Sequence, residues 1–488
     1  MNILFIYSLN DVQSTSKPLW RQNQIAFGIS YISSFLKKHG HITKLIVLSK
    51  LFGKKNKNII NKYLKSFCPK LICFAAVATE WNFIRDIATY IKSINPNVFC
   101  LIGGPFASLS PDVILSNNFD ALCIGEGEYP TLELVTQLEK GEFPSSIPNL
   151  WIKHGSVIER NSSRPFLENL DSLPFPDREI WQEWIAEYSE SSILVLISRG
   201  CPFQCTYCCN HAFSKLAPGT YVRFRTPENI IQEIKQLIER FPRRREFFLE
   251  SESIGINKNW SLQLCSELAL FNATLNRPLS FLANLRITPQ ADLEDLFTML
   301  KKSNFNKLYI GLESGSERIR YEILKRNYSN QDVINTVKLA RRYGLKIYFY
   351  NMIGVLGETV SDFKETVKIN RMCLPDNHCT SIFFPYPGTD LYFLCREKGL
   401  LGKPFEVNRE RFEAALDLPG FSKKQIQRSF NWFDYYVYKG RKPLYKILVR
   451  VSFKKLQSNY YWYYLYRKVR RYLPFFELLA NVFREYDK

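Results

Sequence analysis

Short apolar runs alternate with amphipathic stretches over the first 135 residues of the chain. Residues 24–40 carry apolar side chains at helical spacing and end at a glycine, and residues 81–93 predict a second helix. The runs between these stretches are rich in Ile, Leu, Val and Phe, which is typical of buried strands. They cover residues 3–7, 71–75, 98–102 and 121–124. The alternation predicts a doubly wound α/β domain over residues 1–135.

The same rhythm continues over residues 191–395. Strand-like runs at 193–197, 281–286, 307–310 and 345–350 alternate with helical stretches at 227–240, 293–302 and 330–343. Such repeats predict βα units and a parallel sheet that closes into a partial barrel. In sheets of this kind, ligands bind at the carboxyl ends of the strands.

Two further segments have a different character. Residues 136–190 predict a connector, because Pro174 and Pro176 flank an aromatic residue and disfavour a helix there. Residues 396–488 predict a helical extension. A chain of 488 residues has room for two large domains and a smaller third.

The last 66 residues are strongly basic and rich in Trp and Tyr. Residues 423–488 hold 16 Lys and Arg against 4 Asp and Glu, so this segment carries +12 of the chain's formal net charge of +20. Three interpretations stay open: a helical cap that packs on the barrel, a contact with an anionic membrane surface, and a contact with nucleic acid. No apolar run reaches the roughly 18–20 residues of a spanning helix.

The strand at 193–197 leads into a loop with three cysteines, Cys201, Cys205 and Cys208, at the spacing C-x3-C-x2-C. Three thiolate ligands for a cluster of four irons leave one iron open for chemistry, whereas a structural zinc site is normally closed by a fourth ligand. His211 could supply that fourth ligand, and a disulfide framework or a chance spacing are further alternatives. Cys209 is interpreted as a packed neighbour.

Cysteine usage bears on the compartment. The chain has 12 cysteines in 488 residues, far below the density of a disulfide scaffold, and its first residues lack the basic region of a signal peptide. We therefore expect reduced thiols and a cytoplasmic protein.

The cysteine loop and the segments after it resemble the radical S-adenosylmethionine (SAM) superfamily. Tyr207 fills the aromatic position of the superfamily's C-x3-C-x-aromatic-C signature. Glycine- and acid-containing segments at 311–317, 354–359 and 383–390 follow in the expected order. One departure is Leu356, which stands where the family usually has proline.

The resemblance implies a [4Fe–4S] cluster on the three cysteines and a set of SAM-binding residues. Glu313 would lie near the sugar or methionyl part of SAM, Gly354 near the adenine, and Arg286 near the carboxylate. Either Glu250 or Glu252 would take the place of the family's paired acids. The alternatives are a surface ion pair for Arg286 and solvated acids for Glu250 and Glu252.

The first domain resembles the cobalamin-binding (Rossmann-like) domain found in front of one class of radical SAM enzymes. Its strand ends carry the implied contact residues Val77, Thr79, Gly103, Gly104, Gly125, Glu126 and Gly127. The Asp-x-His-x-x-Gly segment of many cobalamin folds is missing, which implies cobalt without a protein histidine below it. The alternative is a flavodoxin-like domain that has lost its ligand.

Together, the two resemblances imply a cobalamin-dependent radical SAM methyltransferase. The cluster would cleave SAM to a 5′-deoxyadenosyl radical, and cobalamin would deliver a methyl group to an unactivated carbon of a small or lipid-like biosynthetic intermediate. An external flavodoxin- or ferredoxin-type donor would supply electrons. The alternatives are a cyclase, oxidase or rearrangement enzyme without methyl transfer, and a non-catalytic scaffold at the membrane.

Overall fold

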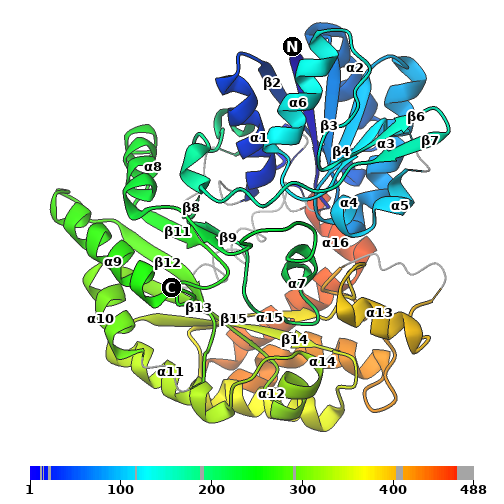
Figure 1. The fold of residues 1–488 in the computed structure, drawn as a ribbon. Helices are drawn as coiled ribbons and strands as arrows, with labels where there is room; N and C mark the ends of the chain where they lie inside the picture. Colours follow the sequence, from blue (N-terminus) through cyan, green and yellow to red (C-terminus); the bar gives the residue numbers. More distant parts are fainter. Residues whose placement is uncertain are drawn as a thin grey trace. The chain divides into compact units, whose positions relative to one another are not determined.

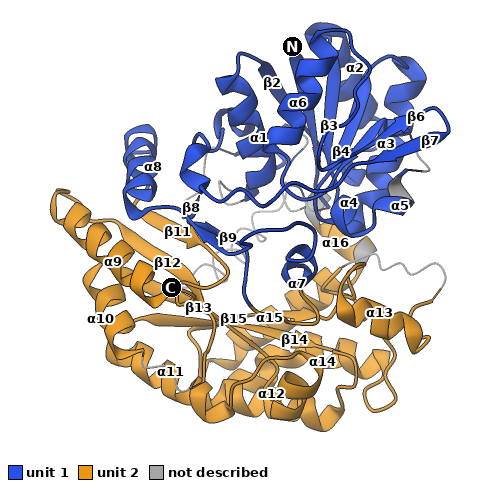
Figure 2. Cartoon of the chain, viewed as in Figure 1, with its two compact units in different colours: residues 1–202, 209–244 blue, residues 203–208, 245–488 orange. Residues whose placement is uncertain are grey.

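A computed structural model describes residues 1–10, 12, 14, 16–19, 24–115, 118–186, 192–289, 293–402 and 410–469. The chain divides into two compact units, coloured separately in Figure 2. Unit 1 comprises residues 1–202 and 209–244, and unit 2 comprises residues 203–208 and 245–488. The cysteine loop therefore divides: Cys201 belongs to unit 1, whereas Cys205 and Cys208 belong to unit 2.

Unit 1 begins with the predicted α/β alternation (Figure 1). Its elements are β1 (Asn2–Ser8), α1 (Phe27–Lys38), β2 (Ile42–Leu48), α2 (Lys55–Phe67), β3 (Leu71–Ala75), α3 (Trp81–Ile94), β4 (Phe99–Gly103), α4 (Pro105–Leu109), α5 (Pro111–Ile114), β5 (Ala121–Cys123), α6 (Glu128–Glu139), β6 (Leu150–His154), β7 (Val157–Arg160), β8 (Ile193–Leu196), β9 (Ser198–Arg199), α7 (Cys209–Phe213), β10 (Arg223–Phe224) and α8 (Pro227–Arg240).

The main sheet of unit 1 has the strand order β2-β1-β3-β4-β5-β6-β7. The first five strands are parallel, as the doubly wound prediction requires, and their apolar side chains form the core of the unit. β6 pairs antiparallel with β5 and with β7. This hairpin lies within the segment expected to be a connector, so the sheet continues beyond residue 135.

Unit 2 contains the second strand–helix series (Figure 1). Its elements are β11 (Glu246–Glu250), α9 (Lys258–Ala273), β12 (Ser280–Leu285), α10 (Glu294–Lys302), β13 (Phe305–Glu313), α11 (Asn330–Arg342), β14 (Lys346–Ile353), α12 (Val360–Cys373), β15 (Asn377–Ile382), α13 (Asp390–Glu397), α14 (Lys423–Tyr438), α15 (Leu444–Ser458) and α16 (Tyr460–Val469).

The strands of unit 2 follow one another in sequence order from β11 to β15, and every adjacent pair is parallel. Figure 1 shows α9 to α12 along one side of these strands. Side chains alternate accordingly, because Leu308, Ile310 and Leu312 of β13 are buried whereas Tyr309 and Glu313 are partly accessible. The parallel sheet expected for the radical SAM part is confirmed, and its more accessible face carries the polar residues.

The basic C-terminal region is helical, as expected. Ile426, Phe430 and Phe433 of α14 are fully buried in a core shared with residues of β14 and α12. α14 therefore caps unit 2, which agrees with one of the three interpretations of the tail. Residues 470–488 lie outside the described residues.

A buried ionic cluster joins α14 to α15. The carboxylate of Asp434, which has no solvent exposure, lies 2.8 Å from Arg450 Nε and 2.6 Å from Lys454 Nζ. His378 of β15 approaches the same carboxylate at 3.4 Å, and burial lowers the pKa of this histidine to about 4. The imidazole is thus neutral at pH 7, and Asp434 faces two cations.

We expect Asp434→Asn to destabilise unit 2 strongly. The substitution removes the carboxylate that both buried cations contact, and breaking a buried ion pair typically costs about 3–5 kcal/mol of unfolding free energy. Chemical or thermal unfolding of the variant measures the loss. The control is Asp112→Asn, because the Asp112–Arg160 pair is exposed and such pairs contribute about 0–1 kcal/mol. Equal stability of the two variants would contradict the prediction.

Candidate active site

A glycine positions the entry to the cysteine loop. Gly200 has φ +88°, and a Cβ atom there would overlap the carbonyl oxygen of Tyr221. Any other residue would strain this turn between β9 and Cys201. Further along, the Cys208 amide donates to the Cys205 carbonyl oxygen at 3.0 Å, which makes a tight turn between these two cysteines.

Arg286, at the end of β12, contacts the cysteine loop. Its Nη1 donates to Cys205 Sγ at 2.9 Å, and its guanidinium carbon lies 3.8 Å from the centroid of the Phe203 ring. The Arg286 amide donates to Ser253 Oγ at 2.9 Å. Among the described residues it makes no ion pair, so the alternative of a surface ion pair finds no support.

Glu313 ends β13 in a left-handed conformation, with φ +58°. Tyr207 Oη donates to Glu313 Oε1 at 3.0 Å, and Arg326 Nη1 lies 3.5 Å from the same oxygen. Arg326 also donates to Tyr207 Oη at 3.0 Å and to the Gly311 carbonyl at 2.7 Å. Burial raises the pKa of Tyr207 well above its usual value, although Arg326 opposes the rise, so the phenol stays protonated.

Gly311 is required by the packing of Glu313. A Cβ atom at Gly311 would lie only 2.6 Å from Glu313 Oε1 and 3.2 Å from Arg326 Nη2. The glycine lets the carboxylate and the guanidinium pack closely against the strand. The motif at 311–313 therefore builds a fixed carboxylate at the end of β13.

The two acids after β11 differ in their surroundings. Glu252 is exposed, whereas Glu250 is mostly buried, and burial together with the charge of Glu252 raises the pKa of Glu250 to about 7. Within the described part of the chain, no cation or hydrogen-bond donor contacts the Glu250 carboxylate. Glu250 is therefore the better candidate of the two for binding a cationic group.

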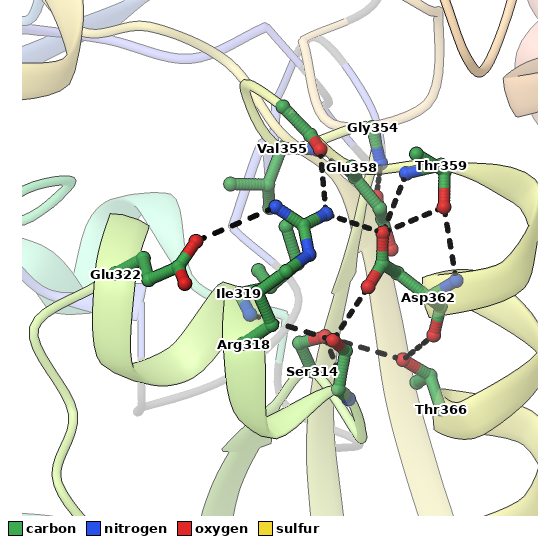
Figure 3. A network of polar contacts seen from close by, with 12 residues as sticks. Ser314, Arg318, Ile319, Glu322, Gly354, Val355, Glu358, Thr359, Asp362 and Thr366 are labelled. Carbon is green, nitrogen blue, oxygen red and sulfur yellow. Dashed lines mark hydrogen bonds and ion pairs between the residues drawn. The ribbon is translucent and has the colours of Figure 1, made fainter.

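The 354–359 loop is held together by its own acid (Figure 3). Glu358 Oε2 accepts hydrogen bonds from the Gly354 amide at 2.5 Å and the Val355 amide at 3.1 Å. Burial raises the pKa of Glu358 to about 8, so its carboxyl is largely protonated at pH 7. Gly354 has φ +79°, and a Cβ there would lie 2.9 Å from the Ile426 side chain of α14.

A second acid fastens the start of α12 (Figure 3). Asp362 accepts hydrogen bonds from Thr359 as a capping box, from Ser316 Oγ at 2.6 Å and from Arg318 Nη2 at 2.6 Å. Although burial opposes the shift, these hydrogen bonds lower the pKa of Asp362 to about 2. The 311–317 and 354–359 segments are thereby joined through one ionised carboxylate.

Unit 1 contains a cavity of about 420 Å³ at the carboxyl ends of its parallel strands. Five of the predicted cobalamin contacts line it, namely Gly103, Gly104, Gly125, Glu126 and Gly127, whereas Val77 and Thr79 do not. The wall is mainly apolar, with Phe5, Phe74 and Leu101 among the lining residues. A mainly apolar wall with a few polar groups is typical of a cofactor-binding cavity.

Backbone conformation and close packing also explain why glycines occupy positions at this cavity. Gly104 has φ +95°, and a Cβ atom there would lie 3.0 Å from the Ala76 carbonyl oxygen. A Cβ on Gly127 would lie 2.7 Å from Ile32 Cδ1. The cavity, rather than the glycines themselves, is thus the observation that indicates a ligand.

Glu126 has a carboxylate that the protein itself neutralises. It contacts Arg199 Nη1 and Arg223 Nη1 at 2.9 Å each, and it accepts from the Leu167 amide at 2.9 Å. Burial raises its pKa, but the two guanidinium groups hold it below its ordinary value. Glu126 therefore fastens the connector at Leu167 and strands β9 and β10 to the end of β5.

The donor chemistry fits the implied groups. Three thiols within eight residues, one receiving a guanidinium hydrogen bond, suit an iron–sulfur cluster. Within the described ranges, no three His, Cys, Asp or Glu side chains come close enough to share a single metal ion. Each cysteine of a cluster binds a different iron, so cluster ligands need not converge on one point.

Two domain models match the chain. Residues 21–135 match the B12 binding domain, and residues 195–369 match the radical SAM superfamily. The chain has a B12-binding domain and a radical SAM domain. The two domain matches confirm the expected fold class and the expectation of a radical SAM enzyme. They also confirm the expected cofactors of such domains, namely a [4Fe–4S] cluster, SAM and cobalamin.

Three known proteins illustrate the similarity. An uncharacterized methyltransferase of Pyrococcus horikoshii is 27% identical over 409 residues, which cover 82% of this chain and 85% of the relative. The anaerobic magnesium-protoporphyrin IX monomethyl ester cyclase of Rubrivivax gelatinosus is 22% identical, covering 80% and 69%. The methyltransferase TsrM of Kitasatospora setae, solved with cobalamin and a [4Fe–4S] cluster, has a TM-score of 0.63 at 15% identity, covering 81% and 75%.

Several residues of this radical SAM protein escaped prediction. Phe203, Arg326, Glu358, Arg199 and Arg223 all contact predicted site residues or lie within predicted segments. Glu358 lies within the predicted 354–359 segment, and its place after Gly354 and Gly357 was a usable signal. The others act through tertiary contacts that spacing does not encode.

Glu358 should make stability fall as pH rises. Its folded-state pKa of about 8 lies above the ordinary 4.5, so its contribution is complete below pH 4.5 and is lost as pH rises toward 8. Glu358→Gln cannot titrate, so we expect the melting temperature of the variant to fall less over this range. Glu250 titrates in the wild type and in the variant, so its effect on stability is the same in both. Asp362 stays ionised over this pH range. Parallel curves for the two proteins would refute this role for Glu358.

Proposed function

We propose that this radical SAM protein methylates an unactivated carbon of a small-molecule or lipid-like biosynthetic intermediate. When bound, the cluster supplies one electron for SAM cleavage and cobalamin supplies a methyl group. The observation that carries the proposal is the contact network that joins the cysteine loop to the ends of β12 and β13 through Arg286 and Glu313. An external flavodoxin- or ferredoxin-type protein would supply the electron.

Each group of residues has a definite task in this proposal. Cys201, Cys205 and Cys208 hold the cluster. One carboxylate oxygen of Glu313 is fixed by Tyr207 and Arg326, and the carboxylate is suited to accept hydrogen bonds from ribose hydroxyls. Glu250, whose carboxylate no cation contacts among the described residues, is suited to the ammonium group of SAM. The cavity in unit 1 would take cobalamin.

The alternative function is a radical reaction without methyl transfer, and one relative favours it. A chain similar over 80% of its length to a named cyclase could also carry out cyclisation, oxidation or rearrangement without methyl transfer. The same cofactors would serve both reactions, so the products have to decide.

Replacing one cluster ligand should abolish SAM cleavage. Anaerobically reconstituted protein is expected to bind about four irons and a corrinoid, and to release 5′-deoxyadenosine from SAM. Cys205→Ala should lose this release, whereas the exposed Cys68→Ala should keep it. 5′-Deoxyadenosine release by Cys205→Ala would overturn the cluster assignment. S-adenosylhomocysteine formed from SAM by the reduced, cobalamin-loaded enzyme supports methyl transfer, and its absence alongside 5′-deoxyadenosine favours the alternative.

We propose in addition that α15 and α16 contact an anionic membrane surface. α15 exposes Leu444, Tyr445 and Leu448, and α16 exposes Tyr461, Trp462 and Leu465, each set at the same i, i+1, i+4 spacing. The two helices pack against each other within a basic segment. Exposed aromatic and apolar side chains beside Lys and Arg are suited to the headgroup region. None of the helices that the structure describes is long and apolar enough to cross a membrane.

The triple variant Tyr461→Ser, Trp462→Ser, Leu465→Ser tests this contact. We expect the wild type to sediment with vesicles containing anionic lipid and less with neutral vesicles, and the variant to lose most of this binding. Leu270→Ser, which alters an exposed residue of α9, is the matched control. These variants are preferable to deleting residues 423–488, because that deletion would remove the buried side chains of α14. Wild-type protein that ignores anionic vesicles would rule the contact out.

A further inference from the structure

Arg286 occupies a position that its expected role does not explain. The expected role, an ion pair with the SAM carboxylate, involves no contact with the cysteine loop. Here Nη1 instead donates to the sulfur of Cys205 at 2.9 Å, and the Cys205 side chain is buried. The hydrogen bond lies on a residue that the radical SAM signature assigns to the cluster.

Two further contacts position Arg286, one through its guanidinium and one through its backbone. Its carbon atom lies 3.8 Å from the centroid of the Phe203 ring, within the distance of a cation–π interaction. The Arg286 backbone amide is held by Ser253 Oγ at 2.9 Å. Phe203 and Cys205 are two residues apart on the same loop. This loop therefore contacts the guanidinium of Arg286 through both an aromatic ring and a sulfur atom.

We propose that Arg286 is a positioning residue that sets the reduction potential of the cluster through its hydrogen bond to Cys205. A donor to a ligating sulfur spreads the negative charge that the cluster gains on reduction, and the cationic guanidinium adds a Coulombic contribution. Both effects favour the reduced state and raise the potential. The inference rests on the cluster being bound by Cys201, Cys205 and Cys208.

Phe203 and the planar shape of the guanidinium make this arrangement specific to arginine. A lysine carries the same charge, but it is a point charge on a flexible stem and cannot stack flat on the ring while donating sideways. Removing the ring leaves the arginine its charge but takes away one of the contacts that hold it against the sulfur. The order of effects should therefore be Gln largest, Lys smaller, and Phe203→Leu smaller again.

An EPR-monitored redox titration of reconstituted protein without SAM tests the proposal. We expect Arg286→Gln to shift the cluster midpoint to a more negative potential at unchanged iron content, with smaller shifts in the same direction for Arg286→Lys and Phe203→Leu. The control is Arg342→Gln, an exposed arginine paired with Glu294, which should show no shift. SAM affinity of the oxidised proteins is measured in parallel by equilibrium dialysis.

The outcomes separate the possible roles. An unchanged SAM-free potential in Arg286→Gln, with or without weaker SAM binding, overturns the proposal and leaves Arg286 a SAM ligand or a structural residue. If Arg286→Gln does not load iron, the midpoint potentials of Arg286→Lys and Phe203→Leu decide between the roles. An unchanged potential in both of these variants overturns the proposal. Wild-type protein that binds no iron would instead contradict the proposed function.

Discussion

The hydroxyl group of Tyr207 fixes the cysteine loop to the strand that presents Glu313. It donates to the Glu313 carboxylate and accepts from Arg326, so a neutral phenol is held between an acid and a base of the same unit. The neighbouring Thr206 Oγ1 donates to the Ile323 carbonyl at 2.5 Å, and the Leu391 amide donates to the Thr206 carbonyl at 3.0 Å. The shape of the loop from Phe203 to Cys208 therefore depends on β13, on the turn after it and on α13. Two of the three expected cluster ligands belong to this loop.

The same constraint explains why an acid with an unusual backbone ends β13. A left-handed conformation is costly for glutamate and persists only when its surroundings determine it. The glycine two residues earlier admits the carboxylate against the strand, and the guanidinium of Arg326 neutralises it there. Strain at Glu313 is thus balanced by contacts from the loop and from Arg326, which are separated from it in sequence.

Much of the fold was predictable because the spacing of apolar residues and the lengths of apolar runs are local properties of the sequence. The helix expected at 227–240 matches α8, and the strand expected at 71–75 matches β3. The β6–β7 hairpin was missed because exposed residues such as Val157 interrupt the apolar pattern that predicts a strand. The prolines of the same segment favoured the interpretation as a connector. For the site, the aromatic slot at Tyr207 was visible, but the use of its hydroxyl was not, since Arg326 reaches it only through the turn after β13.

The acids at the strand ends show how partners distinguish roles that sequence leaves equal. Glu126 faces two arginines, Glu313 faces one arginine and one phenol, and the Glu358 carboxyl is protonated against backbone amides. The charges of Glu126 and Glu313 are thus compensated by cationic side chains of the protein. Glu250 is mostly buried, and burial together with the charge of Glu252 raises its pKa to about 7. Among the described residues, no cation contacts its carboxylate. A ligand that brings a positive charge would lower that pKa and gain binding energy in return, and this supports the proposal that Glu250 binds a cationic cosubstrate.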